Sequence, residues 1–240
     1  MNFQRFCFAI LAFVALVAVG SGSATCSTAT LTGVWGYFLG GGVGQFTADG
    51  NGNITAGSQT VSNGGTILNQ TFTGTYTVAT NCTGTLTLNI AGGGTFTGSF
   101  VLDQMNKGAQ LIETVAGADN VGFAAAEGTV VCGLTGKGAP YAAFLLGKIV
   151  SSNTKVDYVF RFVLNGSGKV SGSGTFVEGG TVTPASISGT YTESSNCTGA
   201  AAITAGPYTF NFNFVVAASG KELFAIETDN GTSVTGFMQE

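Results

Sequence analysis

The fold is decided by a stretch of sequence that occurs twice, as GTYTVATNCTG at residues 74–84 and as GTYTESSNCTG at residues 189–199. Two further matches keep the same order along the chain: Leu31-Thr32-Gly33 with Leu134-Thr135-Gly136, and Ile112-Glu113-Thr114 with Ile226-Glu227-Thr228. Ordered matches of this kind indicate an internal repeat, here of about a hundred residues. We therefore divide the chain into a first β repeat at 25–128 and a second at 129–240.

Each copy alternates with a period of two, which is typical of β-strands that bury one face. In the first copy Phe72, Gly74, Tyr76 and Val78 alternate with threonines, and Asn81-Cys82-Thr83-Gly84 then turns the chain into the next strand. This pattern predicts a β-hairpin in each copy.

Glycine- and asparagine-rich turns recur at short intervals, for example at 49–53 in the first copy and at 165–169 in the second. Counting the segments between such turns predicts about six to eight short strands per copy, in an antiparallel meander. The fold class is therefore all-β. Two tandem up-and-down barrels are favoured because closure removes exposed sheet edges, while two β-sandwiches or one shared β structure are the alternatives. The strands look shorter than the roughly nine to eleven residues that cross a bilayer, which argues against an outer-membrane barrel.

The composition is that of a globular protein with a sparsely charged surface. Hydrophobic residues make up 44% of the chain, charged residues only 8%, and the net charge is −4 without any histidine. A basic surface for nucleic acid or for anionic lipid is therefore not expected.

Residues 1–24 have the features of a secretory signal peptide: Arg5, an apolar stretch from Phe6 to Val19, and small residues up to Ala24. A lipoprotein signal, with Cys26 as the acylated residue, is a weaker interpretation. We expect a secreted or periplasmic protein at the cell exterior after cleavage, with no transmembrane segment in the mature chain.

Four cysteines remain after residue 24, which in an exported chain predicts disulfides. Each copy contributes one cysteine at its start and one in the repeated stretch, so the pairs Cys26–Cys82 and Cys132–Cys197 are favoured over crossed pairing. A zinc site is not expected because close cysteine pairs and histidine are both missing. A calcium site at 49–53 is not expected either, since this loop lacks the glycine and glutamate of an EF-hand.

Candidate binding residues come from acids that interrupt apolar strands. Glu113 and Glu227 each fall on the apolar face of a predicted strand, where burial would demand a partner. We expect Arg161 to pair with Glu227, and Gln45 to hydrogen-bond Glu113. The alternative is that both glutamates face solvent and keep strand edges soluble.

The segment Leu31-Thr32-Gly33-Val34-Trp35, followed by the hairpin 46–57, resembles the first hairpin of the avidin and streptavidin family and the Gly-x-Trp of lipocalins. This resemblance implies eight-stranded barrels with a ligand in the mouth, and makes Trp35 a candidate ligand-binding residue, with a buried plug as its structural interpretation. The paired motifs of both copies also resemble an uncharacterised group of exported bacterial β-rich repeat proteins.

No catalytic motif is present. A chain without histidine cannot form a Ser-His-Asp or Cys-His arrangement, and a carboxylate-based hydrolase is the one enzymatic alternative. We therefore predict a non-enzymatic protein without cofactors, which is either structural and without a ligand or interacts with a cell-surface macromolecule. The alternative is a calycin-like binding module for a small apolar ligand.

Overall fold

The computed structural model describes residues 25–103, 105, 107–128, 132–134, 138 and 140–240. The expected signal peptide at 1–24 lies outside the described residues, as do Thr135 and Gly136 of the first repeated motif. Sixteen strands and two short 3-10 helices, η1 (Thr28–Thr30) and η2 (Ala218–Gly220), make up the described elements.

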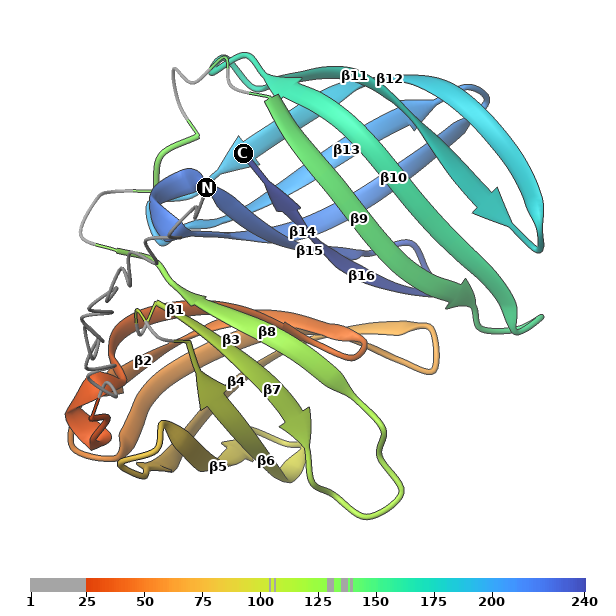
Figure 1. Ribbon diagram of the computed structural model, residues 1–240. Helices are drawn as coiled ribbons and strands as arrows, with labels where there is room; N and C mark the ends of the chain where they lie inside the picture. The colour runs from red at the N-terminus through yellow and green to blue at the C-terminus, as the bar shows by residue number, and fades with distance from the viewer. Residues whose placement is uncertain (1–24, 104, 106, 129–131, 135–137, 139) are drawn as a thin grey trace, which may run out of the picture.

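The strands form two closed antiparallel barrels in tandem (Figure 1). The first contains β1 (Thr32–Leu39), β2 (Gly42–Asp49), β3 (Asn53–Asn63), β4 (Thr66–Val78), β5 (Thr83–Ile90), β6 (Gly94–Leu102), β7 (Gly108–Glu113) and β8 (Val121–Ala126). The second contains β9 (Pro140–Ile149), β10 (Thr154–Leu164), β11 (Lys169–Glu178), β12 (Thr181–Glu193), β13 (Thr198–Ala205), β14 (Tyr208–Ala217), β15 (Glu222–Glu227) and β16 (Thr232–Gln239).

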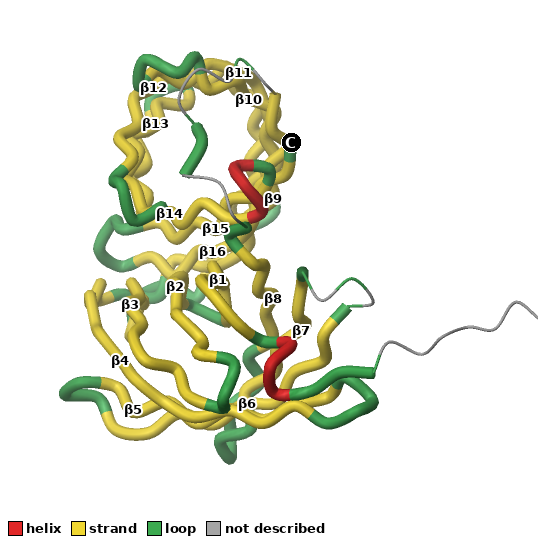
Figure 2. Tube along the Cα trace, turned by 90° about the vertical axis from the view of Figure 1, so that its left-hand side faces the viewer, coloured by secondary structure: helices red, strands yellow, loops and turns green. Residues whose placement is uncertain are grey.

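Each strand pairs with its neighbours in sequence, and each barrel is closed by its first and last strands. β1 pairs with β8 and β9 pairs with β16, so neither sheet has a free edge. The second barrel is seen end-on, as the ring in the upper part of Figure 2. The predicted all-β class, the meander and the tandem up-and-down barrels are confirmed.

Strand length is one respect in which the expectation was wrong. β3 and β10 have 11 residues, and β4 and β12 have 13. The sequence predicts shorter strands because glycine-rich segments are typical of turns. In the structure, glycines such as Gly74 and Gly189 lie inside long strands, at positions where neighbouring atoms leave no room for a side chain.

The repeated stretch places its glycines where a side chain does not fit. A Cβ on Gly74 would lie 2.2 Å from the Thr87 carbonyl oxygen, and on Gly189 it would lie 2.1 Å from that of Ala202. The second glycine of each copy faces an aromatic ring, and a Cβ on Gly84 would lie 2.2 Å from the ring of Phe100. These glycines let the strands pack closely against the core.

The Asn-Cys-Thr-Gly turn has the same structure in both copies. The Oδ1 atoms of Asn81 and Asn196 accept hydrogen bonds from the backbone and hydroxyl groups of Thr83 and Thr198, two residues further on. Both cysteines have positive φ, 67° and 64°. The asparagine therefore stabilises a turn that presents the cysteine to its disulfide partner.

The disulfides join Cys26 to Cys82 and Cys132 to Cys197, as the repeat predicted. The repeated tyrosine secures the same end of each barrel, because Tyr76 and Tyr191 donate their hydroxyl protons to the carbonyl oxygens of Leu31 and Leu134. Both disulfides thus fasten the segment that enters a barrel to the end of its fourth strand.

The two barrels pack against each other along one seam, formed by the outer faces of β1, β2, β3 and β8 in the first barrel and of β14, β15 and β16 in the second (Figure 2). A separate apolar cluster fills the seam: Val43, Ala125, Val215, Ala217, Phe224 and Ile226, with Phe38 and Phe123 beside them. Gly36 faces this cluster, and a Cβ there would lie 2.9 Å from Val215.

Hydrogen bonds also cross the seam. Ser62 Oγ donates to the Thr232 carbonyl oxygen at 2.6 Å, and Thr235 Oγ1 donates to the Gly40 carbonyl oxygen at the same distance. The backbone N–H of Gly231 donates to the carbonyl oxygen of Gly65. The barrels are therefore joined by a packed interface as well as by the chain between them.

Candidate binding sites

Glu227 lies inside the second barrel, at the end of β15, with 2% of its surface exposed. Tyr158 donates its hydroxyl proton to Glu227 Oε2 at 3.1 Å. Burial raises the pKa of the Glu227 carboxyl to about 7, and the hydrogen bond from Tyr158 only partly offsets this. The solvent-facing interpretation of Glu227 is therefore wrong.

The expected ion pair between Arg161 and Glu227 is also wrong. Arg161 is exposed on the outer face of β10, whereas its neighbours Phe160 and Phe162 point into the core. Successive side chains in a strand point to opposite faces, so Arg161 cannot reach an interior carboxylate. The interior partner is Tyr158, which lies on the same face as Phe160.

Aromatic side chains fill the same end of the second barrel around Tyr158. The centroid of its ring lies 5.2 Å from that of Phe210, and the ring centroids of Phe176 and Tyr208 are 5.5 Å apart. These contacts close the barrel over Glu227. The carboxyl group is thus part of a packed interior.

Glu113, the equivalent residue of the first barrel, has a different environment. It is half-buried, and its Oε2 accepts a hydrogen bond from Asn120 Nδ2 at 2.6 Å. The expected partner, Gln45, is wrong: it lies on the outer face of β2 toward the second barrel, and its buried Oε1 accepts no hydrogen bond from the described residues. Strand alternation again explains the error, because Phe46 takes the inward position.

The mouth of the first barrel is open around Glu113. A cleft of about 380 Å³ lies there, lined by polar groups such as Gln59 and Asn120 and by apolar groups such as Leu88 and Phe96. Tyr37 donates its hydroxyl proton to Gln59 Oε1 at 2.7 Å. Burial strongly raises the pKa of Tyr37, so this hydroxyl stays protonated as a donor.

Trp35 lies near the opposite, disulfide-bonded end of the first barrel, where only 1% of its surface is exposed. Its ring is stacked on Phe46 with 6.5 Å between centroids, and its Nε1 donates to the Thr32 carbonyl oxygen. The structure therefore separates Trp35 from Glu113, and separates both from Arg161 and Glu227. A role in ligand binding remains a prediction for each of these four residues.

In the described part of the chain, side chains fill most of the core of each barrel. The space within the apolar core of the second barrel is about 50 Å³, and a corresponding space in the first is about 30 Å³. A drug-sized ligand needs roughly 300 to 1,000 Å³. Side chains thus occupy the positions where a calycin-like barrel would hold its ligand deeply.

Two larger clefts lie along the seam. One, of about 420 Å³, is on the side of β3 and β4 and is lined mainly by hydroxyl and amide groups, among them Thr60, Asn69 and Asn213. Asn213 Nδ2 donates to Thr60 Oγ1 across the seam at 3.1 Å. This cleft offers neutral hydrogen-bonding groups to an occupant.

The other seam cleft, which we call the aromatic cleft, has a volume of about 540 Å³ and lies on the side of β8 and β16. Its lining residues are Phe38, Gln110, Leu111, Val121, Gly122, Phe123, Glu222, Phe237 and Gln239. Among the clefts described here it has the largest volume.

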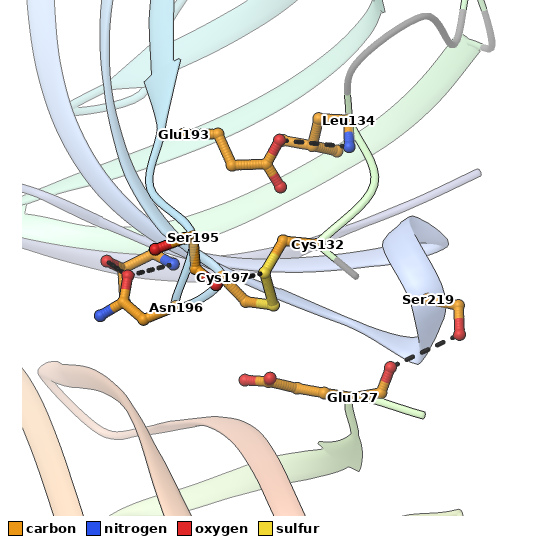
Figure 3. The surroundings of a disulfide bond; sticks show 9 residues. Glu127, Cys132, Leu134, Glu193, Ser195, Asn196, Cys197 and Ser219 are labelled. Atoms are coloured by element: carbon orange, nitrogen blue, oxygen red, sulfur yellow. Dashed lines mark hydrogen bonds between the residues drawn. A yellow bond between two sulfur atoms is a disulfide. The ribbon is translucent and has the colours of Figure 1, made fainter. Parts of the chain in front are cut away.

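A second buried carboxyl group lies at the junction of the barrels. Glu127 follows β8, has 8% of its surface exposed, and has an Oε1 that accepts no hydrogen bond from the described residues. Burial raises its pKa to about 7. Its carbonyl oxygen accepts hydrogen bonds from Ser219 of η2, close to the Cys132–Cys197 disulfide (Figure 3).

At the turns, acidic and amide side chains accept hydrogen bonds from backbone N–H groups. Asp49 Oδ1 accepts from the backbone N–H groups of Asn51 and Asn53, and Asn165 accepts from Ser167 and Lys169 in the second copy. Hydrogen bonds from Asn53 lower the pKa of Asp49. Among the described residues, no three His, Cys, Asp or Glu side chains are grouped so as to hold a metal ion.

No protein-family model matches the chain, and no match was found among curated proteins. Among solved structures, the chain is similar to isotype 1 transferrin-binding protein B from serogroup B Neisseria meningitidis, with 9% identity and a TM-score of 0.38. The match covers 83% of this chain and 65% of that one, so it spans less than two thirds of the solved protein. By its geometry the chain is a tandem pair of closed eight-stranded barrels.

Several residues of these sites were missed from the sequence. Glu222 could have been recognised, because it stands at the start of the same apolar strand that Glu227 ends. Phe38 and Phe237 gave no signal, because nothing in the sequence shows which outer strand faces meet in the seam. No helix among the described residues has the length and hydrophobicity to span a membrane.

Proposed function

We propose that the protein is exported, non-enzymatic, and acts through the outer surfaces of two rigid barrels, either structurally or by contact with another macromolecule. The observation that carries this proposal is the filled interior of both barrels, with spaces of about 50 and 30 Å³. Clefts large enough for a ligand lie instead at one barrel mouth and along the seam. Two disulfides support an extracytoplasmic location, where oxidising conditions preserve them.

Native mass spectrometry of protein purified from its own secretory route tests this proposal. We expect the mass of the chain from Thr25 onward with two disulfides and without a bound small molecule. A small molecule that is retained in stoichiometric amount and is lost in Gln59→Ala, at the mouth of the first barrel, would contradict action through the outer surfaces. Peptide mapping of the same sample would show whether residues 1–24 are removed.

A second candidate function is a binding module for a small ligand in the mouth of the first barrel. The open cleft of about 380 Å³ favours it, because polar groups and apolar walls converge there while aromatic rings close the second barrel. If a ligand is retained, Gln59→Ala is expected to reduce retention more than tenfold. Tyr158→Phe in the second barrel is the matched control and is expected to leave retention unchanged.

A further inference from the structure

The aromatic cleft combines walls from both barrels. Phe38 and Phe123 project from the first barrel, and Phe237 projects from the second, where its ring is stacked on Phe38 with 6.1 Å between centroids. Phe144 extends the aromatic surface beyond the cleft, with 6.3 Å between its ring centroid and that of Phe237. The walls therefore present ring faces and edges to whatever enters.

Exposed apolar side chains continue from the cleft onto the surface. Val121, on the seam strand β8, is 63% exposed, and Phe144, on β9 beside the seam strand β16, is 43% exposed. Ile112 beside Val121 and Leu146 beside Phe144 are also exposed. An exposed apolar patch of this kind, next to a cleft, is typical of a binding surface.

One end of the cleft is acidic. Glu222 lines it, and its Oε2 is buried and accepts no hydrogen bond from the described residues. Burial, followed by repulsion from the nearby Asp103 carboxylate, raises the pKa of Glu222. Neither lysine nor arginine is among the described residues that line the cleft beside it.

We propose that the aromatic cleft binds an amphipathic amine, with its apolar body between Phe38, Phe123 and Phe237 and its ammonium group at Glu222. An ammonium group would pair with the Glu222 carboxylate and contact the ring faces of the walls. This inference rests on the proposed function, because it assigns binding to the seam and not to a barrel interior. The neutral amides of Gln110 and Gln239 complete the described lining of the cleft.

The test compares three probes that share one alkyl chain: octylammonium, 1-octanol and octanoate, titrated into the full chain at pH 8 by isothermal calorimetry. We expect octylammonium to bind about tenfold more tightly than octanol, and octanoate to bind least, because charge pairing and cation–π contact favour the cation. Equal affinities for the three probes, or no binding at millimolar concentration, would overturn the proposal.

The affinities of variants inside and outside the aromatic cleft test whether the probes bind there. In Glu222→Gln the preference for octylammonium over octanol is expected to fall below about threefold, whereas Phe237→Ala is expected to weaken both probes. Glu178→Gln and Val182→Ala change an exposed acid and an exposed apolar residue elsewhere on the second barrel, and are expected to change neither affinity. An unchanged preference in Glu222→Gln would refute the assignment, with the melting temperature confirming that each variant is folded.

A different outcome separates this inference from the proposed function. If Phe237→Ala leaves octylammonium binding intact while Gln59→Ala abolishes it, the amine occupies the mouth of the first barrel. That result would overturn both the cleft site and action through the outer surface, and would favour the second candidate function. If no probe binds and the purified protein is empty, the cleft site fails alone.

Discussion

Glu113 and Glu227 show how one repeated position acquires two environments. Both follow an isoleucine at the end of the seventh strand of their barrel, but Glu113 meets Asn120 at an open mouth, whereas Glu227 meets Tyr158 beneath aromatic rings. A buried carboxyl that is only partly hydrogen-bonded favours its protonated form. Glu227 therefore couples folding to pH.

The free energy of unfolding is expected to fall as pH rises from about 5 to 7. Glu227 and Glu127 have folded-state pKa values of about 7, above the ordinary value of 4.5, so in this window the folded chain holds protons that the unfolded chain has released. Each group is expected to contribute about 1 to 3 kcal/mol below this window, and the contribution is lost as pH rises through 7. Urea denaturation at several pH values measures this slope.

A substitution at Glu227 measures the part of this pH dependence that comes from its carboxyl group. Glu227→Gln keeps an acceptor for Tyr158 without the charge, so we expect a smaller slope and greater stability at pH 8, by about 1 to 2 kcal/mol. Glu113→Gln at the matching position of the first barrel is the control and is expected to change stability by less than about 0.5 kcal/mol. A slope that is the same in Glu227→Gln as in the native chain would contradict this account.

At the scale of elements, the repeated turn and the disulfide act together at one end of each barrel. Asn81 holds the turn, Cys82 adopts a positive φ, and Tyr76 reaches the carbonyl oxygen of Leu31, with the same relations in the second copy. The segment that precedes the first strand is thereby fixed to the end of the fourth. This explains why both copies retain the same residues at these positions.

Removing one disulfide is expected to destabilise the chain by about 3 to 4 kcal/mol, because loops of 56 and 65 residues are no longer closed in the unfolded state. The double variant Cys26→Ser/Cys82→Ser tests the first barrel and Cys132→Ser/Cys197→Ser tests the second. Chemical denaturation, with and without reductant, is the measurement. Reductant is expected to lower the midpoint of the native chain and to have less effect on each variant.

At the scale of the whole molecule, the seam makes one body of two barrels. Gly36 lies against Val215 and Ala217, at the apolar cluster between them. Because packing at such a contact tolerates no added volume, a larger side chain there must push the barrels apart or displace their strands.

Gly36→Val is expected to loosen the seam and to cost about 1 to 3 kcal/mol of stability. Small-angle scattering should then give a larger radius of gyration, while the two disulfides still form. Gly138→Val is the control, because a Cβ at Gly138 has no neighbour within 4 Å. A radius of gyration unchanged in Gly36→Val would show that the seam accommodates the side chain.

The all-β class, the two tandem barrels and the disulfide pairs could all be predicted from the amino-acid sequence. These follow from local signals: the alternation of Phe72 and Tyr76 with threonines, and the recurrence of Asn-Cys-Thr-Gly around Cys82 and Cys197. The boundaries of the repeats and the signal peptide at 1–24 remain predictions from the same patterns.

Which side chains meet depends on the tertiary fold. Alternation assigns a residue to a face, but the partner of Glu227 depends on which strands of the closed barrel bring their interior residues together, and this was Tyr158 and not Arg161. The aromatic cleft depends on the docking of two outer surfaces, so residues as distant in sequence as Phe38 and Phe237 come into contact. Contacts of this kind arise from packing between sheets, which no periodicity along the chain encodes.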